Sequence, residues 1–184
     1  MTEERIDILS TKNLNNVLRH VERYTWAARI AYGRVIDVAC GTGYGTALIA
    51  GSNKVKSILG IDLSEEAILL CRQRYGRAGK KLSFKIGDAL TVSGAQTIVS
   101  FETIEHLEAP GKFLDRVHHV LDPEGRLLIS VPLDEHEGQN KYHLHTFTEK
   151  SFKKLLLARG FYILSSWYQE DLKNRTLIIN AIPK

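Results

Sequence analysis

The feature that most constrains this chain is an apolar run followed at once by a glycine-rich turn. Val35-Ile36-Asp37-Val38-Ala39 is typical of a buried strand, and Gly41, Gly43 and Gly45 then stand at alternate positions. Glycine is needed where φ is positive or where the backbone must approach a ligand closely. A helix that starts after such a turn presents N–H groups that suit an anionic group. The pattern predicts a strand–turn–helix unit that binds a ligand.

The rest of the chain alternates between strand-like and helix-like patterns. We expect strands over 34–39, 56–61, 82–86, 97–101, 126–131, 161–168 and 176–182, the last two being antiparallel neighbours. We expect helices over 14–31, 43–50, from Ser64 onward, 110–121 and 148–158. Ser64 is a good N-cap, Thr146 or Thr148 caps the last helix, and Pro132 ends the strand over 126–131. This alternation predicts an α/β fold with a mostly parallel sheet.

The chain has 184 residues, of which 43% are hydrophobic. This length suits one domain over residues 1–184, with a real core. We expect residues 1–32 to form an N-terminal helical segment that serves as a lid. The lysines are scattered and the net charge is only +4, which disfavours a nucleic-acid partner.

The sequence also bears on the cellular compartment. The first residues are polar, and no apolar run approaches the length of a membrane span. Cys40 and Cys71 do not form a closely spaced pair, so neither a disulfide framework nor a zinc site is indicated. We therefore expect a cytoplasmic protein.

Three acidic residues lie at or just after the carboxyl ends of predicted strands, where α/β sheets bind ligands. Asp37 lies at the end of the first strand, where a carboxylate repels a pyrophosphate but suits the ammonium and sulfonium charges of a methionine moiety. Asp62 ends the second strand and can accept hydrogen bonds from both ribose hydroxyls. Asp88 follows the third strand and can accept one from the exocyclic amine of adenine. Each of these residues alone is also a common turn or cap residue.

A dehydrogenase site contains a similar glycine turn and an acidic residue on the ribose, so a nicotinamide cofactor is an alternative. The glycines here have the spacing G-x-G-x-G rather than G-x-G-x-x-G, and Asp37 is unfavourable to a pyrophosphate. Both features favour the methionine-containing ligand.

The chain resembles class I S-adenosylmethionine-dependent methyltransferases, above all the small-molecule methyltransferase domain group. The resemblance includes residues 37–45, Asp62, Gly87-Asp88, 100–107 and 121–125. It departs from the pattern at Gln96-Thr97, where Phe-Asp is usual, and at Pro-Glu-Gly, where Pro-Gly-Gly is usual. The resemblance implies a Rossmann-like seven-stranded sheet in the order 3-2-1-4-5-7-6, with strand seven antiparallel and helices on both faces. It implies S-adenosylmethionine as cofactor, bound by Asp37, Gly41, Gly43, Tyr44, Asp62, Leu63, Asp88, Ala89 and Phe101.

A second group of polar residues follows the fourth predicted strand. Glu102, Glu105 and His106 have the spacing i, i+3, i+4, which in a helical turn places them on one face. The loop over 133–145 adds Tyr142, His143 and His145.

Three interpretations of this group stay open. The residues pack the turn against the cofactor; or His106 or His143 is a general base; or Glu102, Glu105, His106 and a loop histidine hold a divalent cation. The last arrangement resembles ubiquinone-pathway O-methyltransferases and small-RNA 2′-O-methyltransferases. We expect His106 and His143 to be catalytic and the site to hold no metal.

The resemblance implies a methyltransferase that acts on a hydroxyl of a small molecule, glycan or lipid by in-line transfer. Methyl transfer depends mainly on positioning, so the lack of a nucleophilic triad is expected. The alternatives are a metal-assisted O-methyltransferase, a non-catalytic S-adenosylmethionine-binding partner and a nicotinamide oxidoreductase. The acceptor, the oligomeric state and the pathway are not indicated by the sequence.

Overall fold

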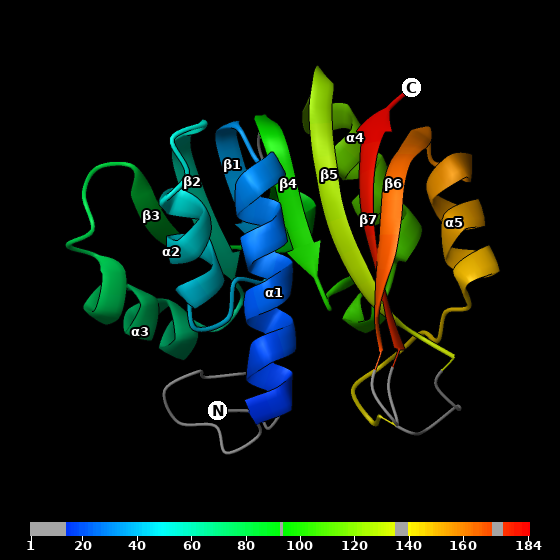
Figure 1. Ribbon diagram of the computed structural model, residues 1–184, viewed down its shortest axis with the longest axis horizontal. Coiled ribbons are helices and arrows are strands. Elements are labelled where there is room, and N and C mark those ends of the chain that lie inside the picture. The colour runs from blue at the N-terminus through cyan, green and yellow to red at the C-terminus, as the bar shows by residue number, and fades with distance from the viewer. Residues whose placement is uncertain (1–13, 93, 135–139, 171–174) are drawn as a thin grey trace. The chain divides into compact units, whose positions relative to one another are not determined.

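The computed structural model describes residues 14–92, 94–134, 140–170 and 175–184. The chain forms a seven-stranded sheet in the order β3-β2-β1-β4-β5-β7-β6 (Figure 1). Strand β7 is antiparallel to both of its neighbours, and the other described pairs are parallel. The predicted Rossmann-like fold is therefore confirmed.

The chain falls into two compact units, Met1–Ala89 and Leu90–Lys184. The single domain over residues 1–184 stays a prediction. None of the helices within the described residues is both long and apolar enough to cross a membrane.

Unit one contains the predicted strand–turn–helix motif. Its elements are α1 (Leu14–Ile30), β1 (Gly33–Val38), α2 (Tyr44–Ala50), β2 (Val55–Asp62), α3 (Glu65–Tyr75) and β3 (Leu82–Ile86). The bounds that were predicted agree with these to within a residue, and no end was predicted for α3. Ser64 caps α3 as predicted, because its Oγ accepts a hydrogen bond from the Ala67 N–H at 3.2 Å.

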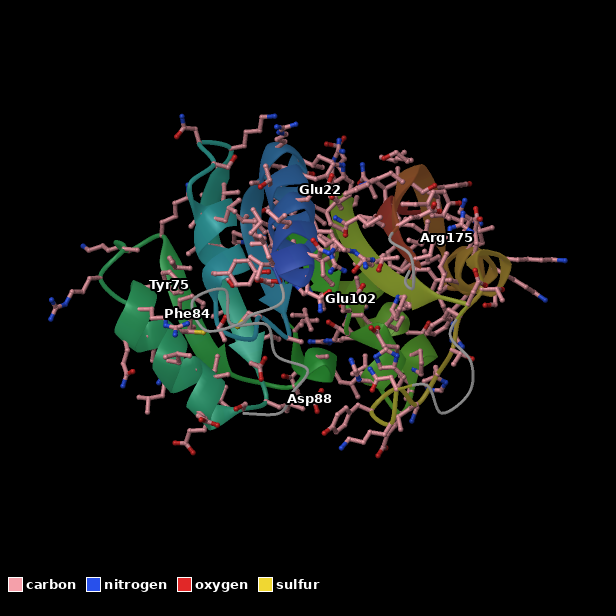
Figure 2. The ribbon with its side chains drawn as sticks, turned by 60° about the horizontal axis from the view of Figure 1, so that its bottom comes forward. Glu22, Tyr75, Phe84, Asp88, Glu102 and Arg175 are labelled. Carbon is pink, nitrogen blue, oxygen red and sulfur yellow. The ribbon has the colours of Figure 1, made fainter. Side chains whose placement is uncertain are left out.

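Helices of unit one pack on each other and on the strands. Helix α1 lies along α2 (Figure 1). Helix α3 is joined to β3 by the rings of Tyr75 and Phe84, whose centroids are 6.3 Å apart (Figure 2). The proposed lid over 1–32 is seen as a helix from Leu14 onward, and residues 1–13 lie outside the described residues.

Unit two contains the antiparallel pair. Its elements are β4 (Ala95–Phe101), the 3-10 helix η2 (Ile104–His106), α4 (Pro110–Val120), β5 (Leu121–Leu133), α5 (Glu149–Ala158), β6 (Phe161–Glu170) and β7 (Arg175–Pro183); a further 3-10 helix, η1 (Ala89–Thr91), spans the boundary between the units. Thr148, not Thr146, caps α5, in a capping box with Ser151. Residues 135–139 of the predicted loop and 171–174 of the β6–β7 connection lie outside the described residues.

Strand β5 is longer than predicted. Its pairing with β4 shifts in register between Ala95↔Leu121 and Thr97↔Arg126, so residues 123–125 form an irregularity inside the strand. The prediction that Pro132 ends the strand is wrong, since β5 continues to Leu133. Pairing with β4 stops at Ser130, and beyond that point a residue without an N–H donor is tolerated.

Candidate functional site

The three glycines after β1 have different surroundings. Gly41 and Gly43 have φ values of 55° and 79°, which disfavour any residue with a side chain. A Cβ at Gly41 would meet no atom of the described residues within 4 Å, whereas one at Gly43 would lie 2.7 Å from Cys71 Sγ. A Cβ at Gly45 would overlap the ring of Tyr24 at 2.3 Å. Only Gly41 therefore borders open space, while Gly43 and Gly45 allow close packing.

Asp62 links the glycine turn to the start of helix α3 by hydrogen bonds. One carboxylate oxygen accepts a hydrogen bond from the Gly41 N–H and the other from the Ser64 N–H, each at 2.9 Å. The residue is 7% exposed, whereas its neighbour Leu63 is 71% exposed. A carboxylate has about four lone-pair positions, and it acts only as an acceptor. A polar acceptor thus stands next to an exposed apolar side chain, as a ribose and an adenine ring require.

Asp37 is fully buried at the end of β1. Thr46 Oγ donates to it at 2.6 Å and the Tyr24 hydroxyl at 3.3 Å. Burial raises the pKa of Asp37 to about 7 against the opposing effect of these two donors. Thr46 and Tyr24 were not identified from the sequence; the position of Thr46 in the first turn of α2 was the available signal. The contact of Asp37 with a cofactor stays a prediction.

Tyr44 is the first residue of α2, and its ring packs edge-on against Tyr24, with centroids 5.5 Å apart. Within the described residues its buried hydroxyl has no hydrogen-bond partner. Burial raises the pKa of this hydroxyl above its usual range, so it remains a donor. A buried donor without a partner is costly, and a polar ligand group would satisfy it.

The remaining predicted residues of unit one lie around the end of β3. Asp88 is exposed and follows the strand (Figure 2), while Ala89 is 8% exposed. The open space at Gly41, the carboxylate of Asp62, the exposed Leu63 and the buried hydroxyl of Tyr44 fit an adenosine-containing ligand with polar ends. Phe101, the last residue of β4, is buried in unit two.

Glu102 does not share a helical face with Glu105 and His106. It has a φ of 49°, and the 3-10 helix begins only at Ile104 (Glu102 is labelled in Figure 2). Its N–H donates to Ser130 Oγ at 3.1 Å, and its carboxylate accepts from the same hydroxyl at 2.8 Å. Ser130 was not identified from the sequence, although a hydroxyl inside the apolar strand β5 was a signal for it.

Glu105, His106 and His143, here called the histidine cluster, are brought together in unit two. Each offers a metal-ligand type of atom, and these atoms lie within 4.8 Å of one another. Glu105 is fully buried, and its Oε1 lies 3.9 Å from His106 Nε2. The rings of His106 and His143 meet edge to face, with centroids 4.7 Å apart.

The segment over 140–145 is held against η2 by hydrogen bonds. The N–H groups of Leu144 and His145 both donate to the Glu105 carbonyl, at 2.9 and 3.1 Å. His106 Nδ1 donates to the Tyr142 carbonyl at 3.0 Å, and His145 Nε2 donates to the Leu107 carbonyl at 3.0 Å. The position of His143 therefore follows from a docked segment.

Asn140 completes this arrangement, because its side chain contacts His143 Nε2 at 2.9 Å. Asn140 was not identified from the sequence, and no local pattern pointed to it. The cluster can act chemically in two ways: a histidine can accept a proton beside a buried carboxylate, or the three side chains can ligate a cation.

The model of a family described as a methyltransferase domain matches residues 31–174 of this chain. A probable S-adenosylmethionine-dependent methyltransferase of Mycolicibacterium smegmatis is 29% identical over 150 residues, which are 78% of this chain and 58% of that protein. A ubiquinone biosynthesis O-methyltransferase of Xylella fastidiosa is 31% identical over 103 residues, covering 53% of this chain and 41% of that protein. The chain spans about half the length of the curated relatives it matches.

Solved structures share the fold. The structure of magnesium protoporphyrin IX methyltransferase from Synechocystis with bound SAH has a TM-score of 0.76 and 16% identity, covering 93% of this chain and 84% of that one. Identity at this level is evidence for the fold alone.

Proposed function

We propose that this chain, which belongs to the methyltransferase domain family, transfers a methyl group from S-adenosylmethionine to a hydroxyl of a small molecule, glycan or lipid. The observation on which the proposal rests is the glycine turn fastened to Asp62, with open space at Gly41. The name of the O-methyltransferase relative supports oxygen as the acceptor atom.

S-adenosylmethionine is the cofactor. When bound, it supplies a methyl group on a sulfonium that is already a good leaving group. Asp62 accepts hydrogen bonds from the ribose hydroxyls, Asp88 accepts one from the adenine amine, and Leu63 contacts the ring. Asp37 provides the negative charge that favours the cationic methionine moiety. Gly41, Gly43, Tyr44, Ala89 and Phe101 complete the predicted set.

His106 acts as the general base. Its Nδ1 donates to the Tyr142 carbonyl, so in the neutral ring Nε2 holds the lone pair. Nε2 takes the proton from the acceptor hydroxyl, and the nearby buried carboxylate of Glu105 stabilises the resulting imidazolium. Positive charge on His106 is favoured in this way as the acceptor oxygen becomes methylated.

Two further features support an apolar acceptor and a reducing compartment. Leu144 lies next to His143 and is 57% exposed, so it offers an apolar contact beside the cluster. Cys40 and Cys71 are free thiols, which supports an activity in the cytoplasm.

Calorimetric titration with S-adenosylmethionine, S-adenosylhomocysteine and NADH tests the cofactor assignment. We expect both adenosyl ligands to bind and NADH not to bind. Tight NADH binding without a response to the other two would refute the proposal. Binding of the adenosyl ligands without transfer to any phenolic, glycan or hydroxy-lipid acceptor would favour the non-catalytic alternative.

The second candidate is a metal-assisted O-methyltransferase, which is favoured by the mutual proximity of the ligand atoms in the histidine cluster. The Glu102 carboxylate accepts a hydrogen bond from Ser130 Oγ. The ligand set of Glu102, Glu105 and His106 that the sequence suggested for a cation is therefore not brought together. Mn²⁺ soaked into crystals, with anomalous scattering as the readout, tests this candidate. A peak within ligand distance of Glu105 and His106 would favour it, and so would loss of transfer with chelator that Mg²⁺ restores.

A further inference from the structure

Asn140 makes hydrogen bonds to both residues that follow Lys141. Its side-chain oxygen accepts from the Tyr142 N–H at 3.0 Å, and its side-chain nitrogen lies 2.9 Å from His143 Nε2. Its backbone carbonyl also accepts from the His143 N–H at 3.1 Å. The side-chain amide is thereby held between a backbone group and an imidazole.

These contacts determine which nitrogen of His143 bears the proton. The Tyr142 N–H only donates, so the amide oxygen of Asn140 must face it. The amide NH₂ then faces His143 Nε2 and also only donates, so Nε2 must accept. In the neutral ring the proton is therefore on Nδ1. Exchanging the amide oxygen and nitrogen would set two donors against each other at Tyr142.

The backbone of Tyr142 has the corresponding effect on His106. The Tyr142 carbonyl only accepts, so His106 Nδ1 bears the proton and Nε2 holds the lone pair. The carbonyl of Tyr142 thus orients the imidazole of His106. The N–H of Tyr142 orients the amide of Asn140, and this amide in turn orients the imidazole of His143. The edge-to-face contact of the two rings depends on both orientations.

This hydrogen-bond pattern does not fit a cation site. A ring nitrogen that bears a proton cannot ligate a metal, and the lone pair of the other His143 nitrogen is directed at Asn140. Only Glu105 and His106 of the cluster then supply ligand atoms. Two ligands are fewer than zinc ordinarily takes from a protein.

We propose that Asn140 is a positioning residue that holds His143 with its proton on Nδ1 and thereby keeps the histidine cluster an acid–base site rather than a cation site. This inference rests on the proposed function, in which His106 is the base. Replacing the amide by a carboxylate, in Asn140→Asp, would reverse the pattern. The carboxylate would accept a hydrogen bond from His143 Nε2–H, and Nδ1 of His143 would then hold the lone pair. A carboxylate–histidine pair of this kind is the usual second shell of a metal ligand.

Two-bond ¹H–¹⁵N spectra of the ¹⁵N-labelled full chain at about pH 8, where an ordinary imidazole is neutral, report the tautomer directly. We expect His143 to show the Nδ1–H form. In Asn140→Ala we expect the signal to move toward the Nε2–H form. An Nε2–H form in the unaltered chain, or no change in Asn140→Ala, would overturn the proposal.

Mn²⁺ titration provides a second readout. We expect Asn140→Asp to bind Mn²⁺ about 10- to 100-fold more tightly than the unaltered chain, the range that second-shell partners of metal ligands typically contribute. Lys141→Gln is the matched control, because it also changes the net charge by one unit beside the cluster but leaves the contacts of Asn140 in place. An equal gain in Mn²⁺ affinity in Asn140→Asp and Lys141→Gln would show only an effect of net charge. It would overturn the inference that Asn140 prevents His143 from ligating a cation.

The spectra require neither cofactor nor acceptor. An Nδ1–H tautomer that depends on Asn140 would support the positioning role even if no acceptor were methylated, and in that case only the proposed function would fail.

Discussion

The glycine turn of unit one and the histidine cluster of unit two are held in place by different means. The turn follows directly from a buried strand, and one side chain, Asp62, fastens its backbone at 2.9 Å. The cluster depends on a docked segment, because His143 lies 37 positions after His106 along the chain. His143 is oriented by the side chain of Asn140, which is itself held by the Tyr142 N–H. A contiguous motif thus forms the cofactor region, and hydrogen bonds across the chain form the proposed acid–base site. The two regions should therefore respond differently to substitution.

Replacing the proposed base should have the largest effect and should be confined to the rate. We expect His106→Ala to lower turnover by roughly 100- to 10,000-fold, the usual range for a positioned general base. The affinity for S-adenosylhomocysteine should stay near normal. Production of S-adenosylhomocysteine with a methylated acceptor from a phenolic, glycan and hydroxy-lipid panel measures the rate.

His119→Ala is the matched control, because His119 is an exposed histidine on α4 of the same unit. An unchanged rate in His106→Ala would remove the base from the mechanism. Loss of cofactor affinity in His106→Ala would show instead that the histidine cluster also contributes to cofactor binding.

Substitution of Asp62 should affect binding rather than the chemical step. Asp62→Ala removes two acceptors for the ribose hydroxyls, each worth about 1.5–3 kcal/mol before water replaces them, so we expect a loss of roughly 30- to 1000-fold in affinity. The variant also leaves the Gly41 and Ser64 N–H groups without this acceptor.

Calorimetry with S-adenosylhomocysteine measures the affinity, and circular dichroism checks that the domain stays folded. Asp115→Ala is the control, since it removes an exposed carboxylate that pairs with Arg159 on the surface. A normal dissociation constant in Asp62→Ala would mean that Asp62 does not hold the ribose.

The two regions also differ in how far the sequence predicted them. Strand β3 was predicted at its observed bounds, and the Ser64 cap was predicted from its residue type and position, because both depend on local patterns. The left-handed backbone of Glu102 and its bonds to Ser130 depend on the neighbouring strand, so a helical spacing rule could not reveal them. Asn140 had no signal at all, since its role exists only after the segment docks.

Within the glycine turn, two substitutions separate binding from packing. Gly43→Ala should destabilise the protein by roughly 2–3 kcal/mol, because the backbone is left-handed and the new methyl would lie 2.7 Å from Cys71 Sγ. The methyl of Gly41→Ala meets no neighbour among the residues that the structure describes, and this variant should cost only about 1 kcal/mol. Its methyl would nonetheless occupy the open space that the cofactor needs, so its cofactor affinity should fall more than its stability. Urea unfolding and calorimetry on both variants measure the two effects. Equal losses of stability would contradict the distinction between packing and ligand contact.

The smallest expected effect concerns protonation of Asp37. Burial raises the folded-state pKa of Asp37 from 3.8 to about 7. The protonated carboxyl therefore stabilises the folded state fully below about pH 4, and this stabilisation is lost as the pH rises through 7. Between pH 6 and pH 8 this amounts to about 1.4 kcal/mol of unfolding free energy lost by the unaltered chain relative to Asp37→Asn. Thr46→Val should move the loss to higher pH, because the Thr46 hydroxyl that favours the carboxylate is removed.

Urea unfolding at intervals from pH 5 to pH 8.5 measures this difference, with and without S-adenosylmethionine. The cationic methionine moiety favours the ionised carboxyl, so the cofactor should shift the midpoint of the loss to lower pH. Parallel curves for the unaltered chain and Asp37→Asn would show that Asp37 is ionised throughout this range. If the cofactor did not change the pH midpoint of this loss, Asp37 would not contact the cofactor. Its role would then be to accept the hydrogen bonds of Thr46 and Tyr24.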